Sequence, residues 1–177
     1  MKVIVFPLAI VLLFGLAHPL PAEDVQQVFS GIPWGTSIEA FQGLHEAARS
    51  GNIAFYKRDK DMYSIADVAL PDIVYGFYNG KFFSVFLKIA NPDDPEKIKN
   101  FLDKVYGPAR DQLRLDQTIY IWDYLNVKIK LKQILDATHT KLAYYYVPLS
   151  IKANASRPNQ DTEHIFKLDD GLPEYDF

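Results

Sequence analysis

The chain is 177 residues long, with a formal net charge of −3, no cysteine, and a heavy aromatic load of 11 tyrosines and 12 phenylalanines. The lack of cysteine excludes disulfides, thiol catalysis and a lipid-modified cysteine, and the mildly acidic charge excludes a general attraction to nucleic acid. Aromatic side chains favour strands and carry large apolar surfaces, so the composition favours a sheet with a sizeable core.

The first 22 residues have the pattern of a secretory signal peptide. Lys2 is followed by an apolar run from Val3 to Ala17 and by a turn-forming stretch that ends in Ala22. This run is shorter than the roughly 20 apolar residues that a spanning helix needs. We expect cleavage after Ala22, with cleavage after Ala17 or an uncleaved interfacial anchor as alternatives. Because small secreted eukaryotic domains usually contain disulfides, the mature chain is expected in a bacterial periplasm or secreted, without a stable membrane anchor.

A loop over residues 31–36 leads into the first predicted helix. Thr36 is expected to cap this helix, and Glu39 three residues later completes a capping box. Apolar residues then recur at helical spacing, at Ile38, Phe41 and Leu44. The pattern predicts an amphipathic helix that ends near Ser50.

Four strands are predicted next, over residues 52–58, 62–70, 73–78 and 81–89. Asn79-Gly80 joins the last two as a tight hairpin, because both turn residues tolerate positive φ. This turn predicts that Gly76 lies opposite Phe83 and leaves room for its ring. Both strand faces are apolar, so the hairpin is expected to be central or covered on both sides. The expected faces are Phe83, Val85, Leu87 and Ile89 on one side, and Phe82 and Phe86 on the other.

The second predicted helix has clear boundaries. Asp94 is expected as its N-cap, Pro95 occupies the first helical position, and Gly107-Pro108 stops it. Three further strands are predicted over residues 118–124, 125–134 and 141–149. The expected buried stripe of the helix is Ile98, Phe101, Leu102 and Val105.

This order of elements predicts an α+β fold: an antiparallel sheet of about seven to eight strands with two main helices packed on one face. Residues 23–149 are expected to form one domain. Residues 150–177 are expected to be an acidic, largely disordered or loosely docked tail, because they contain six acidic side chains and three basic ones. A further hypothesis places this tail on the lysines of the 125–134 strand.

Catalytic motifs are not apparent, so the chain is expected not to be an enzyme and to need no cofactor. His45, His139 and His164 lie far apart in the sequence, without a second ligand at metal spacing, so no metal site is expected. A cryptic hydrolase remains as an alternative, because such sites assemble across a fold. Its candidate carboxylates are Asp67, Asp72 and Asp123.

Two features are candidates for binding. Tyr120, Trp122 and Tyr124 share one strand face, and Lys128, Lys130 and Lys132 share a face of the next strand. A surface of aromatic rings and lysines could bind sugar, peptide or an anionic polymer by stacking and charge. The structural alternative is that these lysines only solvate the outer face. The second feature is Trp34, which is either a core plug or an exposed anchor for a partner.

The opening Gly31-Ile-Pro-Trp-Gly-Thr36, the Asn79-Gly80 turn and the helix end Tyr106-Gly107-Pro108 resemble uncharacterised exported bacterial proteins over about residues 29–148. These motifs are structural and imply no activity. The helix-plus-sheet order is distantly similar to BamE-type and β-lactamase-inhibitor-type modules, which bind other proteins. The chain departs from the first type by lacking a lipidated cysteine and from the second by lacking disulfides.

The sequence therefore predicts an exported, non-catalytic binding module that acts on an envelope protein or an extended polymer. The alternative from another class is a carrier, in which the aromatic-rich sheet curls around a small apolar ligand or lipid.

Overall fold

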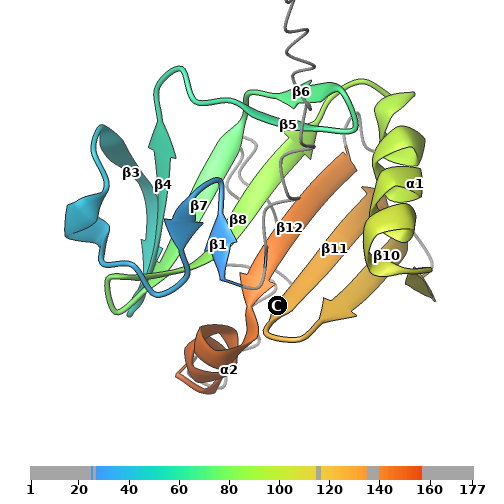
Figure 1. Cartoon of the computed structure of the whole chain (residues 1–177). Coiled ribbons are helices and arrows are strands. Elements are labelled where there is room, and N and C mark those ends of the chain that lie inside the picture. The colour runs from blue at the N-terminus through green and yellow to red at the C-terminus, as the bar shows by residue number, and fades with distance from the viewer. Residues whose placement is uncertain (1–24, 26, 115–116, 135–139, 157–177) are drawn as a thin grey trace, which may run out of the picture.

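The computed structural model describes residues 25, 27–114, 117–134 and 140–156. They form an α+β fold around one eight-stranded antiparallel sheet with strand order β3-β4-β7-β8-β12-β11-β10-β9 (Figure 1). Each half of the sheet is a four-stranded meander, and the halves meet at the β8–β12 pair. The strands are β3 (Leu44–Ser50), β4 (Ile53–Arg58), β7 (Ile73–Tyr78), β8 (Lys81–Ile89), β9 (Arg110–Arg114), β10 (Gln117–Tyr124), β11 (Val127–Ile134) and β12 (Thr140–Tyr146).

Shorter elements complete the fold. Two small hairpins, β1–β2 (Val28–Phe29, Ile32–Pro33) and β5–β6 (Tyr63–Ile65, Val68–Leu70), stand outside the main sheet. Helix α1 (Asp94–Tyr106) carries the chain from the central strand β8 to the edge strand β9, as Figure 1 shows. Helix α2 (Val147–Ala155) follows β12 directly. Within the described part of the chain, neither helix is long and apolar enough to cross a membrane.

The predicted helix that ends near Ser50 is wrong. A 3₁₀ turn over Ile38–Ala40 is followed by strand β3 instead. The Thr36 hydroxyl donates to the Pro33 carbonyl (2.6 Å), so it does not cap a helix. β3 pairs with β4 along its whole length, and this long-range pairing overrides the weak local helical spacing.

The β7–β8 hairpin has the predicted turn and a shifted register. Asn79 and Gly80 both have positive φ, and Phe77 lies opposite Phe82 as expected. A bulge follows, so that Gly76 lies opposite Ser84 rather than Phe83. The extra residue reverses the alternation expected for β8. Phe82, Val85, Leu87 and Ile89 therefore belong to one core, and Phe83 and Phe86 to the other.

The two helices lie on opposite faces of the sheet rather than on one. Ile98 and Leu102 of α1 are buried in a core that includes Val85, Val127, Ile129, Leu131 and Leu142; we call this side the α1 face. Ala153 of α2 is buried in a second core with Phe86, Ala143 and Tyr145, which alternate with the first set along β8 and β12; we call this side the α2 face. Both faces of β8 are covered, which confirms its expected central position.

Helix α2 includes the first residues of the expected tail. Ala153 is fully buried and Ser150 is 9% exposed, so α2 packs on the domain through these two residues, whereas Ile151 is 64% exposed. The remainder of the expected tail, residues 157–177, and the expected signal peptide, residues 1–22, lie outside the described residues.

The β10–β11 turn contains a strained leucine. Leu125 has a φ of 49° and is 76% exposed, so it occupies a left-handed conformation without burying its side chain. Because this conformation costs an L-residue about 1–2 kcal/mol, we expect Leu125→Gly to raise the free energy of unfolding by about 1 kcal/mol. Thermal unfolding measures the change. Leu113→Gly is the matched control: Leu113 is equally exposed but extended in β9, so this substitution is expected to destabilise. Equal effects of the two substitutions would contradict the argument from strain.

Candidate functional site

The three aromatic candidates lie beneath helix α1. The β10–β11 hairpin places Tyr124 opposite Val127, Trp122 opposite Ile129 and Tyr120 opposite Leu131, which puts the rings on the α1 face. The same register puts Lys128, Lys130 and Lys132 on the α2 face. The expected joint surface of aromatic rings and lysines is therefore not formed, because the two sets point to opposite sides of the sheet.

Side chains on one side of helix α1 contact the three aromatic rings instead. The Lys99 ammonium lies 5.0 Å from the centre of the Tyr120 ring, and the Tyr106 and Tyr124 ring centres are 5.0 Å apart. Between them, the Trp122 indole N–H lies 3.1 Å from both Asp103 Oδ1 and the Gly107 carbonyl. Trp122 is 3% exposed, which places it in the core.

Asp103 connects the end of α1 to this core. Its carboxylate accepts hydrogen bonds from Lys99 (2.6 Å), the Ala109 amide (2.8 Å) and Trp122. Burial alone would raise the pKa of Asp103, but these hydrogen bonds favour the ionised form and lower the pKa below its ordinary value. The group therefore holds the helix end on the sheet and serves as a structural anchor.

Trp34 is also in the core. Its indole N–H donates to the Val25 carbonyl (2.8 Å), and its ring stacks on Phe82 with the centres 4.7 Å apart. Tyr146 stacks parallel to it at 6.1 Å, and 9% of Trp34 is exposed. The structure thus places Trp34 as the plug that fixes the N-terminal segment on the α1 face.

The α2 face brings together more lysines than the three predicted from the sequence. Lys132 of β11 lies opposite Lys141 of β12, and Lys141 lies opposite Lys88 of β8. These lysines form one row across adjacent strands, spanning about 10 Å at the usual strand spacing. Lys130 and Lys128 follow along β11 on the same side. We call this set the lysine face: Lys88, Lys128, Lys130, Lys132 and Lys141.

Opposed like charges make the row unusual. Like charges directly across a strand pair destabilise a sheet, yet this row contains two such pairs in succession. At the other end of the face, Asp123 Oδ2 lies 2.8 Å from the Arg110 guanidinium, and Asp123 Oδ1 lies 3.6 Å from Lys128 Nζ. Asp123 is the one acidic side chain that β8, β10, β11 and β12 place on the α2 face. On these four strands, basic side chains therefore outnumber acidic ones on the α2 face.

Apolar and aromatic groups border these charges. The Lys130 ammonium lies 5.5 Å from the centre of the Tyr145 ring, and Ile119 lies opposite Lys132. Lys132 is only 8% exposed, so its aliphatic stem packs on the sheet. The other four lysines of the face are half-buried, so a ligand on this face would meet mainly these four, above apolar surface.

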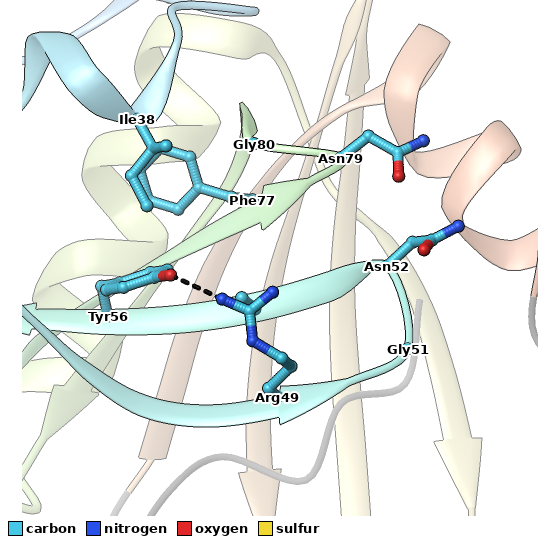
Figure 2. Close-up of a pocket in the computed structure, with 9 residues that line it drawn as sticks. Ile38, Arg49, Gly51, Asn52, Tyr56, Phe77, Asn79 and Gly80 are labelled. Carbon is cyan, nitrogen blue, oxygen red and sulfur yellow. Dashed lines mark hydrogen bonds between the residues drawn. The ribbon is translucent and has the colours of Figure 1, made fainter.

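A separate pocket of about 290 Å³ lies on the α1 face at the β3–β4 turn, between the strand ends and Ile38 (Figure 2). Its charged group is Arg49, which contacts both Glu46 oxygens (2.6 and 3.0 Å) and the Tyr56 hydroxyl (2.9 Å). Hydrogen bonds from Arg49 and Tyr56 lower the pKa of Glu46. The charge of Arg49 is thus balanced within the triad, so this pocket is a weaker candidate for an anion than the lysine face.

The carboxylates considered for a hydrolase are dispersed. Asp72 pairs with Lys57 (3.0 Å), Asp123 with Arg110, and Asp67 is exposed in the β5–β6 turn. His45 is exposed beside Asp59, whereas His139 and His164 lie outside the described residues. Among the described residues, no group of three or more His, Asp or Glu side chains is placed to hold a metal ion.

Comparisons of this chain with models of protein families, with curated proteins and with solved structures find no match. The motifs that carry the resemblance to exported bacterial proteins have structural positions here. Trp34 packs in the core, Asn79-Gly80 forms the central hairpin turn, and Gly107 ends α1 with a φ of 86°. The candidate site therefore rests on the geometry of the lysine face.

Proposed function

We propose that this chain is an exported, non-catalytic binding module that holds an extended anionic polymer across the lysine face. The proposal depends on the row Lys88–Lys141–Lys132. In this row, strand pairing places a lysine directly opposite a lysine on each of three adjacent strands. A row of positive charges attracts a ligand that carries several negative charges in succession.

The shape and chemistry of the face favour a polymer over a small ligand. The row lies across three strands of a sheet, and its charges are spaced at about 5 Å. Lysine ammonium groups are compact point charges on flexible stems, which suits repeated anionic groups in varied geometry better than one bidentate anion.

The carrier alternative has less support. The aromatic rings that a carrier would arrange around a cavity contact one another instead: Trp34 with Phe82 at 4.7 Å, and Phe29 with Tyr144 at 5.2 Å. An envelope protein as the partner is an outcome that the following experiment separates from a polymer.

We expect the triple variant Lys88→Gln, Lys132→Gln, Lys141→Gln to bind dextran sulfate about 100-fold more weakly than the original chain. Each lysine near an anionic surface contributes about 1 kcal/mol, and about 1.4 kcal/mol corresponds to a tenfold change in Kd. Titration calorimetry at low salt measures the affinity, and uncharged dextran should not bind. Added salt should weaken the binding, because salt screens exposed charges.

The matched control is Lys60→Gln, Lys97→Gln, Lys104→Gln, which removes the same charge from exposed positions away from the α2 face. This control should bind dextran sulfate like the original chain. Equal losses of affinity in both variants would show that net charge, and not the position of the lysines, accounts for the binding. If the chain does not bind dextran sulfate but captures a protein from cell envelope in stoichiometric amount, the partner is a protein and not a polymer.

A further inference from the structure

The pocket at the β3–β4 turn has a frame that backbone hydrogen bonds hold in place. Three segments meet there: the β3–β4 turn, the β7–β8 turn and the 3₁₀ turn that begins at Ile38. The Asn79 amide donates to the Asn52 carbonyl (2.8 Å), and the Ile38 amide donates to the Gly80 carbonyl (2.9 Å). The volume of about 290 Å³ is therefore preformed, which lowers the cost of ordering the pocket around a ligand.

The polar part of the pocket centres on Arg49. This residue lies opposite Ala54 of β4, and Figure 2 shows it between Tyr56 and Asn52. Glu46 balances the charge of Arg49, and among the described residues no acidic side chain lines the pocket. Arg49 Nε and Nη2 donate to Glu46 and Tyr56, whereas Nη1 has no partner in the described part of the chain. Nη1 therefore keeps two N–H donors for an uncharged acceptor.

Apolar side chains form the rest of the wall: Ile38, Ala54 and Phe77. Ala54 lies opposite Arg49 on one side and Phe77 on the other, so its small side chain leaves room between these two larger ones. Small-ligand sites usually enclose about 300–1,000 Å³. A pocket at the lower end of this range admits one ring-sized unit, with polar contacts on one side and apolar contacts on the other.

We infer that this pocket binds one N-acetylated sugar unit through its acetamido group. The acetamido carbonyl accepts from Arg49 Nη1, and the methyl group packs against the apolar wall. Hydroxyl groups of the ring meet the exposed side chains of Asn52 and Asn79 at the rim. A neutral ligand fits best, because Glu46 already balances Arg49 and an ammonium group would meet no carboxylate in the lining. This site is independent of the proposed function, because the lysine face lies on the opposite side of the sheet.

The test titrates methyl β-N-acetylglucosaminide into the full chain and follows the backbone amide NMR shifts. Methyl β-glucoside is the control ligand, because it lacks only the acetamido group. The pocket variants are Arg49→Met, which removes the unpaired donors, and Ala54→Leu, which fills the hollow. The matched control variant is Arg110→Met, because Arg110 is an exposed arginine in an ion pair (2.8 Å) on the opposite edge strand, β9.

We expect the acetylated sugar to produce saturable shifts at the two turns of the pocket, and the glucoside to produce none, as for uncharged dextran. The amides concerned are those of Gly51, Asn52, Asn79 and Gly80. Arg49→Met should weaken the binding about tenfold, because it removes hydrogen bonds from a charged donor. Arg110→Met should leave the binding unchanged, and Ala54→Leu should abolish it. If Ala54→Leu does not fold, the comparison of the two arginine variants decides.

Three results would overturn the inference: no saturable shifts, equal affinities for the two sugars, or equal affinities of the two arginine variants for the acetylated sugar. N-acetylglycine N-methylamide carries the same acetamido group without a sugar ring. If it bound as tightly as the sugar, the inference would be overturned in favour of a peptide ligand. Dextran sulfate binding by Arg49→Met should equal that of the original chain, so the pocket and the lysine face are tested separately.

Discussion

Replacing Trp122 with alanine is expected to lower the free energy of unfolding by about 3–5 kcal/mol, the usual cost of removing a large buried ring. The ring is 3% exposed under α1, and its N–H bonds both the Asp103 carboxylate and the Gly107 carbonyl. The substitution therefore leaves a cavity and removes a donor from a partly buried carboxylate. Urea denaturation measures the loss as a lower midpoint with an unchanged slope.

Trp122→Phe separates the contribution of the ring volume from that of the hydrogen bonds. This variant keeps most of the ring volume but loses the indole donor, so we expect a smaller loss of about 1–2 kcal/mol. Because Trp122 faces α1, dextran sulfate binding by the folded Phe variant should be unchanged. If the Phe variant kept its stability but lost polymer binding, Trp122 would belong to the binding surface, and its position in the core would be refuted.

Elements with strong local signals were predictable from the sequence. Pro95 at its start and Gly107 at its end mark α1, and Asn79-Gly80 marks the hairpin. The backbone preference of each of these residues is a property of the residue itself and does not depend on contacts with distant parts of the chain. The error at residues 36–50 has the opposite cause. Three apolar residues at helical spacing are a weak signal, and pairing with β4 decides the outcome.

The bulge and the lysine row depend on contacts that no local pattern encodes. The sequence identified Lys128, Lys130 and Lys132 as one strand face, and the register confirms that they share a side. Lys88 and Lys141 were missed, because they join the row only through the adjacency of β8 and β12, which lie more than fifty residues apart. Alternation within β8 was a usable signal for Lys88, but the bulge at Phe83 makes counting from the turn unreliable.

Gly76 is the position where the β7–β8 pair has the least room. A Cβ added there would lie 2.0 Å from Ser84 Oγ and 3.3 and 3.4 Å from the rings of Phe55 and Phe83. We therefore expect Gly76→Ala to lower the free energy of unfolding by about 3 kcal/mol, the upper part of the usual range for overpacking a core. Thermal and urea unfolding measure the loss.

The partner substitution Ser84→Ala identifies which atom causes the clash. Ser84 Oγ is buried and has no hydrogen-bond partner among the described residues, so its removal alone should change stability by less than about 1 kcal/mol. In the double variant Gly76→Ala, Ser84→Ala the closest contact is gone, and the remaining ring contacts need only small shifts. The double variant should therefore recover about 2 kcal/mol of the loss, a coupling typical of residues in contact. Additive effects of the two substitutions would show that the rings, and not the hydroxyl, limit the space at Gly76.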